Sequence, residues 1–444
     1  MAGRPERPTL GDGSSHAVGS AIIDGMIRRF AAAVALAGLA AAIVDGRQPP
    51  AGPIARLASP AGPNSAQPHL SVSPRGVLLS WIERAGPKAT LRFAERTASG
   101  WSAPRDVASG TNWFVNWADV PSVMRLSNGT LAAHWLQKSG PDTYAYDVRL
   151  SYSKDDGRTW SPSFLPHSDG TSTEHGFASL FQMPGGGLGL TWLDGRATKA
   201  GGGHGGHGAG AMTVHAAAFG RDWKQTFELP VDLRVCDCCP TTVAVTADGP
   251  IVAYRDRSDD DVRDIMIARL EKGKWTEPKP VHDDGWKIAA CPVNGPMLSA
   301  NGRTVAIAWF TAKDDQPRAW VAFSGDAGRT FGPPLRLDDS STLGRVDIEL
   351  MPDGSAIASW IEFVQGAKVP GDNEPRAQLR VRRVTSSGAR SPAATVSSVA
   401  GSRASGYPRL AGFGKDVVLA WTETGDGRSQ VQTATIRGVL DALR

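Results

Sequence analysis

The residues best suited to chemistry are the four cysteines, which all lie in two short segments, VCDCCPTT and AACPVNG. In an exported protein they would form disulfides, such as one between Cys291 and the CDCC segment. As thiolates they would instead bind copper or zinc, with His175 or Asp237 as a further ligand. As a dithiol pair they would undergo redox exchange. The candidate metal ligands in these segments and nearby are Cys236, Cys238, Cys239, Cys291 and His175.

A glycine- and histidine-rich tract, GGGHGGHGAG at residues 201–210, adds two imidazoles, His204 and His207. Imidazole is a ligand for borderline metal ions, but the same composition is typical of a mobile loop. The tract shortly precedes the CDCC segment in the chain. We therefore keep two interpretations, a mobile loop and a loop whose histidines share one ion with the cysteines.

A repeated strand pattern must position these residues. Seven times the chain shows an apolar segment that ends in an aromatic residue and a polar cluster, as in LTWLD and ASWIE. The spacing between successive aromatic residues runs from 51 (Trp309 to Trp360) to 62 (Trp192 to Tyr254). Repeats of this length, made of short strands, are typical of a β-propeller. We expect most of these aromatic rings to pack between neighbouring blades.

We predict one all-β domain over residues 54–444, a β-propeller of seven four-stranded blades, with six blades as the alternative if one repeat folds differently. The seventh repeat ends after its third strand, at Ile436. Residues 54–59 would supply the missing outer strand. Their pairing with the last blade would close the ring and remove an exposed sheet edge.

The first 45 residues are expected to be an export signal. Arg28 and Arg29 precede a 15-residue apolar run at residues 30–44, which is shorter than the roughly 20 residues that span a bilayer. A cleaved signal is therefore favoured over an N-terminal anchor, with Met26 as the expected start and residues 46–53 as a linker. The mature protein would be periplasmic or extracellular and would contain no integral membrane span.

The charge of the chain argues against nucleic acid as a partner. Its 48 Lys and Arg residues and 44 Asp and Glu residues give a formal net charge of +4. No basic run is interleaved with aromatic residues, as a nucleic-acid groove would require.

A propeller gathers the residues at the start of each inner strand around one central pocket. The cysteines fall at the openings of the fourth and fifth repeats, so their spacing predicts that they meet at the mouth of this pocket. The other residues expected there are His69, Asp119, His175, Arg345, Asp347, Tyr407 and Arg409.

Two turns share the pattern S-x-D-x-G-x-T-[W/F], at residues 153–160 and 324–331. In such a turn the Asp carboxylate accepts backbone N–H groups, the Gly allows a positive φ, and the terminal aromatic ring packs into the blade. The pattern resembles the Asp-box (BNR repeat) turn of the sialidase (neuraminidase) superfamily of β-propellers. The resemblance covers nearly the whole mature chain and implies that these turns lie on the face away from the active site.

The resemblance also implies a set of functional residues. The family uses a Tyr nucleophile with a Glu partner, an Asp acid/base and an arginine trio that binds the substrate carboxylate. In this chain Tyr407 resembles the nucleophile, with Glu423 as its partner. Asp119 is the corresponding acid/base, and Arg255 resembles one member of the trio. The other substrate-binding candidates are Arg345, Arg409, Arg196 and His69.

The catalytic pattern is matched only in part. The first blade has Pro68 and His69 where the family has an Arg, and the segment leading to Arg255 begins with Cys-Cys-Pro where the family has a Glu. A phenol with a pKa near 10 needs such a base to act as a nucleophile.

The sequence thus predicts an exported, sialidase-like propeller that binds or hydrolyses an acidic glycan in its central pocket, as an exo-glycosidase without a required cofactor would. Two alternatives remain. One is a non-hydrolytic propeller with a copper, zinc or redox site at the mouth of the pocket. The other is a scaffold that binds a protein partner.

Overall fold

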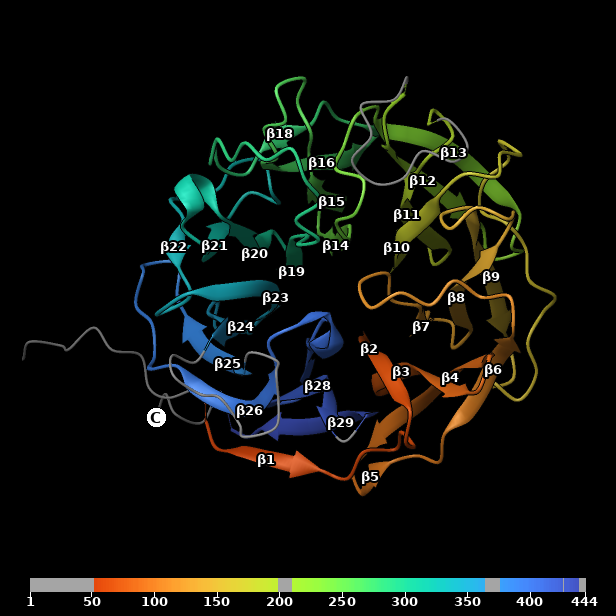
Figure 1. The fold of residues 1–444 in the computed structure, drawn as a ribbon, viewed down its shortest axis with the longest axis horizontal. Coiled ribbons are helices and arrows are strands. Elements are labelled where there is room, and N and C mark those ends of the chain that lie inside the picture. Colours follow the sequence, from red (N-terminus) through yellow and green to blue (C-terminus); the bar gives the residue numbers. More distant parts are fainter. Residues whose placement is uncertain (1–51, 199–209, 364–375, 426, 439–444) are drawn as a thin grey trace, which may run out of the picture. The chain divides into compact units, whose positions relative to one another are not determined.

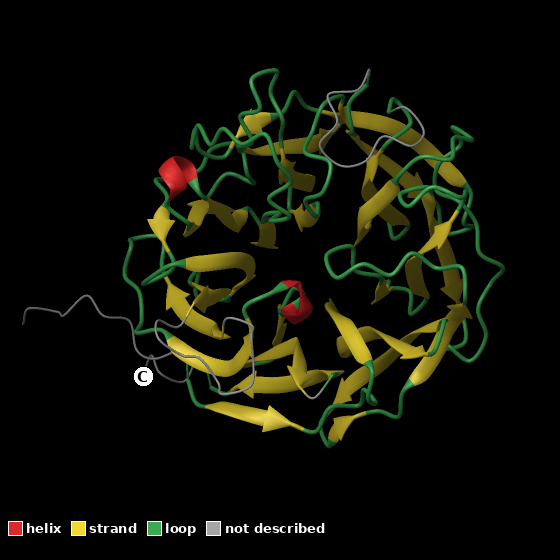
Figure 2. Ribbon diagram, in the orientation of Figure 1, coloured by secondary structure: helices red, strands yellow, loops and turns green. Residues whose placement is uncertain are grey.

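The computed structural model of the chain describes residues 52–198, 210–363, 376–425 and 427–438. All of them belong to the second of two units, residues 46–444. They are almost entirely β-strand and loop, with two three-residue 3₁₀ helices, η1 (Lys313–Asp315) and η2 (Arg403–Ser405) (Figure 2). No helix in this part of the chain is long and apolar enough to cross a membrane. The expected export signal, His204 and His207 lie outside the described residues.

The described strands form seven antiparallel sheets, arranged as the blades of a β-propeller (Figure 1). The prediction of seven blades is confirmed. The strands of each blade are given from the inside outward. The first blade contains β2 (Ser65–Ser73), β3 (Gly76–Ala85), β4 (Lys88–Thr97) and β6 (Arg105–Gly110), with β5 (Gly100–Trp101) beside β4. The second contains β7 (Ser122–Arg125), β8 (Leu131–Lys138) and β9 (Tyr146–Ser153), and the third contains β10 (His175–Gln182), β11 (Leu188–Asp194), β12 (Thr213–Phe219) and β13 (Gln225–Asp232). A single bridge between Leu150 and Phe164 marks the outer position of the second blade.

The next three blades follow the same order. They contain β14 (Thr242–Thr246), β15 (Gly249–Arg255), β16 (Ile265–Glu271) and β18 (Lys279–Pro280), with β17 (Lys274–Trp275) beside β16; β19 (Met297–Asn301), β20 (Thr304–Thr311), β21 (Arg318–Ser324) and β22 (Leu335–Arg336); and β23 (Thr342–Leu350), β24 (Ala356–Phe363), β25 (Arg376–Val384) and β26 (Ala394–Ala400).

The seventh blade joins the two ends of the domain. Its strands are β27 (Arg409–Phe413), β28 (Asp416–Gly425), β29 (Arg428–Ile436) and, outermost, β1 (Ile54–Leu57). Ile54 pairs with Ile436 and Leu57 with Thr433, and Figure 1 shows β1 along the outer side of β29. The predicted closure is confirmed. It covers an edge that would otherwise expose unpaired backbone groups.

The repeated aromatic residues fill the space between blades, as expected. The rings at Trp81, Trp192, Trp309, Trp360 and Trp421 are fully buried. Trp81 of β3, for example, packs in one cluster with Ala411 and Val418 of the last blade. A buried aromatic side chain removes 150–250 Å² from water, so these rings hold neighbouring blades together.

The two Asp turns have the hydrogen bonds that their residue types predict. Asp155 accepts from the backbone N–H groups of Arg158 (3.1 Å) and Thr159 (2.9 Å) and from the Thr159 hydroxyl (2.6 Å). Gly157 has a φ of +80°. Asp326 makes the same contacts in the second turn. In both of these turns the bonds fix the connection that follows the third strand of the blade.

The two faces of the propeller carry different turns and loops. Arg75, in the turn between β2 and β3, pairs with Asp156 of the first Asp turn at 2.6 Å. Arg329 of the second Asp turn pairs with Asp248, in the turn between β14 and β15, at 2.5 Å. These turns therefore share one side, which we call the turn face. The loops that lead into the inner strands lie on the opposite side, which we call the mouth face.

Candidate functional site

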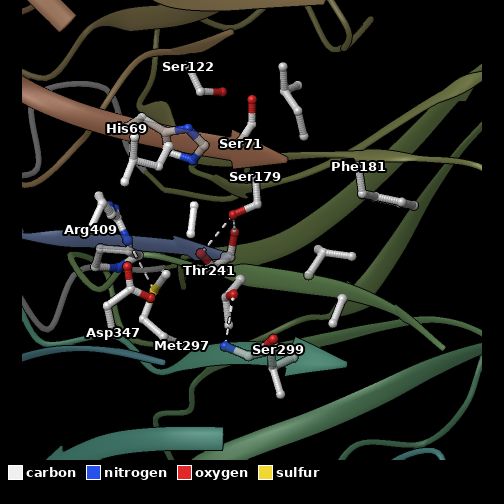
Figure 3. A pocket seen from close by; sticks show the side chains of 18 of the residues that line it. His69, Ser71, Ser122, Ser179, Phe181, Thr241, Met297, Ser299, Asp347 and Arg409 are labelled. Atoms are coloured by element: carbon white, nitrogen blue, oxygen red, sulfur yellow. Dashed lines mark hydrogen bonds between the residues drawn. The ribbon is translucent and has the colours of Figure 1, made fainter. Parts of the chain in front are cut away.

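The inner strands surround a central channel of about 450 Å³. Every blade contributes to its wall. Small hydroxyl side chains line much of it, among them Ser71, Ser122, Ser179 and Ser299 (Figure 3). The same view shows Arg409, Asp347 and Met297 pointing toward one another.

Two predicted site residues, His69 and Arg409, lie in this channel. Arg409 Nη1 lies 3.2 Å from Met297 Sδ. Burial raises the pKa of Asp347 to about 6, although the charge of Arg409 acts against this shift. Burial and the same charge hold the pKa of His69 well below its usual value. The guanidinium that was expected to meet a substrate carboxylate thus lies beside a carboxylate of the protein.

Tyr407 is 1% exposed and sits beneath the mouth face. Its hydroxyl donates to the Val293 carbonyl over 2.5 Å, and its ring stacks on Trp117 with centroids 5.8 Å apart. Burial raises the pKa of the Tyr407 phenol well above its usual value. Its expected partner Glu423 pairs instead with Arg56 of β1, the outermost strand of the blade, at 3.2 Å. The structure therefore does not pair this phenol with that carboxylate.

Asp119 is a fully buried carboxylate at the opening of the second blade. It accepts hydrogen bonds from the Phe177 backbone N–H (2.7 Å) and the Tyr146 hydroxyl (3.1 Å). Burial raises its pKa to about 7, and both hydrogen bonds oppose that shift. The space beside it admits only glycine at position 176, where a Cβ would lie 2.1 Å from the carboxylate. Asp119 therefore ties the second blade to the third.

The expected arginine trio does not converge. Arg255 donates to three backbone carbonyls, those of Asn294 (2.9 Å), Arg263 (2.6 Å) and Phe310 (2.6 Å). Arg345 donates to the Ser402 carbonyl and the Ser405 hydroxyl, and its guanidinium lies over the Trp117 ring. These groups fix the loops of the mouth face.

Arg196 and His175 belong to a separate group between the second and third blades. Arg196 pairs with Asp194 (2.7 Å) and Glu228 (2.6 Å). His175 lies near Asp194 and other carboxylates. Asp237, the other residue considered as a ligand beside the cysteines, pairs with Arg257 at 3.5 Å.

The four cysteines meet beneath the mouth face, at the loops that lead into β14 and β19. Cys236 Sγ lies 3.4 Å from Cys239 Sγ and 3.9 Å from Cys238 Sγ. The Cys238 thiol also hydrogen bonds to Cys291. None of the four is joined in a disulfide in the structure, and only Cys291 is partly exposed. The separations of 3.4 and 3.9 Å are far longer than the about 2.05 Å of a disulfide.

The surroundings favour negative charge on one sulfur. Arg263 Nη1 donates to Cys236 Sγ over 3.1 Å, and the Asn294 backbone N–H donates to Cys239 Sγ over 3.4 Å. Burial opposes ionisation of Cys236. Hydrogen bonds from its two cysteine neighbours and the charge of Arg263 nevertheless hold the pKa of its thiol well below the usual value. Hydrogen bonding to Cys236 raises the pKa of Cys238, and burial raises that of Cys239.

This geometry fits a metal ion bound by sulfur. Four sulfurs at about 2.3 Å from a tetrahedral Zn²⁺ would be about 3.8 Å apart. The separations of 3.4 and 3.9 Å lie on either side of that value. Cu⁺ is the other common ion that prefers thiolates. Arg263 and the backbone N–H of Asn294 would donate to the bound sulfurs as outer contacts.

Sequence reasoning missed three residues that shape this site: Arg263, Trp117 and Asn294. Arg263 lies two residues before β16, opposite the end of β15. A residue-by-residue prediction of the strand pairing in the fourth repeat would therefore have placed it near the CDCC segment. Trp117 and Asn294 lie in loops outside any strand register. No pattern in the sequence singled them out.

No family model matches the chain, and no curated protein matches it significantly. Solved structures of similar fold include a Dyadobacter fermentans protein of unknown function, with a TM-score of 0.49 and 12% identity over 86% of this chain and 98% of that one. Another is the NanB sialidase from Streptococcus pneumoniae, with a TM-score of 0.44 and 9% identity over 88% and 95%. A polysaccharide lyase that acts as an ulvan lyase has a TM-score of 0.43 and 13% identity over 66% and 76%. These similarities concern the fold alone and say nothing of the activity of this chain.

Proposed function

We propose that this protein is a non-hydrolytic, metal-binding β-propeller that holds one thiophilic ion, Zn²⁺ or Cu⁺, at the mouth of its central channel. The observation that carries the proposal is the convergence of Cys236, Cys238 and Cys239, whose Sγ atoms lie within 4.8 Å of one another, with separations of 3.9 and 3.4 Å from Cys236. Cys291 hydrogen bonds to Cys238 and is the fourth candidate ligand. Cys236, Cys238 and Cys239 come from the loop before β14, and Cys291 comes from the loop before β19. The ion would therefore join the fourth and fifth blades.

The charges around the cluster support ion binding. Four thiolates and a divalent ion carry a net charge of −2, and burying such a charge is costly without compensation. Arg263 contacts Cys236 directly, and the positive charge of Arg255 acts on Cys239. Two buried guanidinium groups thus lie where they would balance the charge.

Ion content and thiol reactivity, measured together on the untagged full-length chain, test the proposal. The chain is incubated with Zn²⁺ or Cu⁺ under reducing conditions and freed of excess ion. We expect one equivalent bound by the cysteines and four thiols that react with an alkylating reagent only after a strong chelator removes that ion. Two disulfides, or four reactive thiols without a bound ion, would contradict the proposal.

A matched pair of variants locates the ion. Cys238→Ser removes a sulfur that contacts the other cysteines and is expected to abolish stoichiometric binding at the cysteine cluster. Asp259→Asn changes a side chain that is 92% exposed, in the loop after Arg255, and should bind the ion as the wild type does. Circular dichroism of both variants establishes that the fold is retained.

A second candidate function, binding of an acidic sugar, is favoured by a recess of about 260 Å³ between the first and last blades. Trp117, Arg84 and Arg403 line it. Two further lining atoms, Gln67 Oε1 and Thr422 Oγ1, are buried without a hydrogen-bond partner among the described residues. Guanidinium groups bind carboxylates bidentately, and an aromatic side chain offers apolar surface to a sugar ring.

Calorimetric titration with sialic acid, glucuronic acid and glucose tests this second candidate. We expect the two acidic sugars to bind and glucose to bind far more weakly. Arg403→Ala should weaken the acidic sugars, whereas Arg158→Ala, an exposed change in an Asp turn on the turn face, should not. Equal binding of all three sugars, or no effect of Arg403→Ala, would remove this candidate.

A further inference from the structure

A second group of side chains whose types can bind a metal ion lies between the second and third blades and contains none of the cysteines. Asp147 lies near the start of β9, His175 begins β10, and His167 lies in the loop that connects them. The two imidazole rings stack in parallel, with centroids 3.9 Å apart and planes at 4°. The side chains of His167 and His175 are 2% and 0% exposed. Bulk water therefore does not solvate their nitrogens.

One carboxylate holds both rings from the same side. Asp169 Oδ1 lies 2.8 Å from His167 Nδ1 and 3.2 Å from His175 Nε2. Asp169 is itself oriented by the backbone N–H and hydroxyl of Thr171. An imidazole that donates one N–H to a carboxylate presents a lone pair on its other nitrogen. Asp169 therefore turns His167 Nε2 into an acceptor, whereas its contact with His175 Nε2 is an ion-pair distance without a hydrogen bond.

A third acceptor faces His167 Nε2 and His175 Nδ1. Asp147 Oδ1 lies 3.6 Å from His167 Nε2 and 3.4 Å from His175 Nδ1. All three atoms are buried and have no hydrogen-bond partner among the described residues. When both imidazoles are neutral, three electron-rich atoms face one another without a donor and repel, and burial strengthens the repulsion. A cation between them would remove it.

We propose that Asp147, His167 and His175 bind one divalent transition-metal ion, for which Zn²⁺ is the probe. Tetrahedral ligands at about 2.0–2.1 Å from the ion lie about 3.3 Å apart, close to the distances of 3.4 and 3.6 Å. Because the lone pair of an imidazole lies in the ring plane, at least one of the two stacked rings must turn when the ion binds. Two imidazoles and one carboxylate suit such an ion better than Mg²⁺ or Ca²⁺, which prefer oxygen ligands. A zinc site with three protein ligands keeps its fourth position for water or substrate.

The other carboxylate near His175 is already occupied. Asp194 accepts from Trp192 Nε1 over 2.7 Å and from Arg196 over 2.8 and 2.7 Å. Arg196 also pairs with Glu228 at 2.6 Å and lies 3.8 Å from Asp169. The positive charge of Arg196 is thus balanced mainly by the carboxylates of Asp194 and Glu228. The charge of a divalent ion would be balanced by Asp147 and Asp169.

The competing occupant is a proton on His175. Burial lowers the pKa of this imidazole, but the nearby carboxylates of Asp147 and Asp169 outweigh burial and raise it to about 9. A proton would thus also relieve the repulsion at neutral pH. Zn²⁺ must displace it from Nδ1, which makes the two occupants distinguishable by spectroscopy.

Nuclear magnetic resonance of the full chain, labelled with ¹⁵N at histidine, tests the proposal. On addition of Zn²⁺ we expect the His167 Nε2 and His175 Nδ1 signals to move to positions typical of metal-bound imidazole, with saturation at one equivalent for this pair. Unchanged signals of His167 and His175 in the presence of Zn²⁺ would overturn the proposal and assign the site to a proton.

Variants provide a second, independent readout of Zn²⁺ affinity. Asp147→Asn keeps the shape of the side chain, and His167→Gln removes one nitrogen ligand. Each should weaken binding at this site about 100-fold. His282→Gln is the control, because His282 also lies beside a carboxylate, that of Asp284, but is 42% exposed and outside the group. Wild-type affinity in both ligand variants would overturn the proposal, and if His167→Gln does not fold, Asp147→Asn decides.

The inference is independent of the cysteine site, because the two groups share no residue. In Cys238→Ser the histidine signals should still respond to Zn²⁺ as in the wild type. Either proposal can therefore fail alone.

Discussion

The cysteine cluster and the Asp147–His167–His175 group lie at similar positions in different parts of the ring, and they differ in donor chemistry and assembly. The cysteines occupy the loops of the fourth and fifth blades and offer only sulfur. The second group joins the second and third blades and offers nitrogen and oxygen. The regular strands bring loop ends together in both places. The side chains at those ends then decide which ion suits each place.

The two groups also differ in how their ligands are prepared. Arg263 and a backbone N–H donate to the sulfurs, so the cysteine cluster is adapted to hold negative charge. Asp169 instead accepts from His167 and places its negative charge 3.2 Å from His175 Nε2. A positively charged neighbour stabilises thiolates, whereas a negatively charged neighbour orients imidazoles.

The largest expected effect separates the two groups. Cys238→Ser should lower the affinity of the sulfur site for Zn²⁺ by more than about 100-fold, because the ion loses one of its ligands. The affinity of the Asp147–His167–His175 group should stay unchanged, since distant sites act independently. Competition with a chromophoric chelator measures both affinities. A parallel loss at both sites would show that the groups form one unit.

Acidity should distinguish the two sites through proton release. Cys238 and Cys239 have raised pKa values and are neutral at pH 7, so ion binding must release at least two protons there. Below those pKa values, affinity should therefore rise about 100-fold for each unit of increasing pH. At the other site only the proton of His175 is displaced, which predicts about tenfold per unit below pH 9. Calorimetry at several pH values measures both slopes, and equal slopes would contradict this difference.

Removal of the carboxylate that orients the imidazoles should affect one site only. Asp169→Asn keeps all three proposed ligands but removes the charged acceptor of the His167 hydrogen bond and the negative charge beside His175. We expect Zn²⁺ affinity at the Asp147–His167–His175 group to fall about 10–100-fold. The sulfur site should be unaffected. Unchanged affinity at both sites, measured by the same chelator competition, would show that Asp169 does not position the ligands.

The smallest expected effect concerns Tyr407, which lies beside the cysteine cluster. Tyr407→Phe removes the hydrogen bond to the Val293 carbonyl and should lower the free energy of unfolding by about 1 kcal/mol. Urea denaturation measures this loss. Turnover of an aryl sialoside should be equally absent in wild type and variant. A wild-type activity that the substitution abolishes would restore Tyr407 as a nucleophile.

The strand pattern was sufficient to predict the fold. The spacing of Trp81, Trp309 and the other aromatic residues gave the number of blades, because every blade needs a ring to fill its gap with the next. The seventh repeat ends after its third strand, and this predicted that β1 would complete the last blade. Such features recur with the repeat, so a single sequence contains several copies of the same signal.

The candidate sites could be predicted only in part. The cysteines were visible because they are rare and begin adjacent repeats. Arg255 and Tyr407 lie near the expected mouth, but their polar atoms bind backbone carbonyls, which no residue pattern encodes. His167 and Asp169 lie in a loop between blades, and loops have no periodicity that would place them beside His175. The loop path depends on packing that only the three-dimensional structure contains.

X-ray absorption spectroscopy of the zinc-loaded full chain tests the central claim most directly. In His167→Gln, where the second group is disabled, the proposal predicts one zinc per chain surrounded by sulfur at about 2.3 Å. A shell of nitrogen and oxygen alone, or no zinc retained after removal of excess ion, would contradict the assignment of the four cysteines as a metal centre.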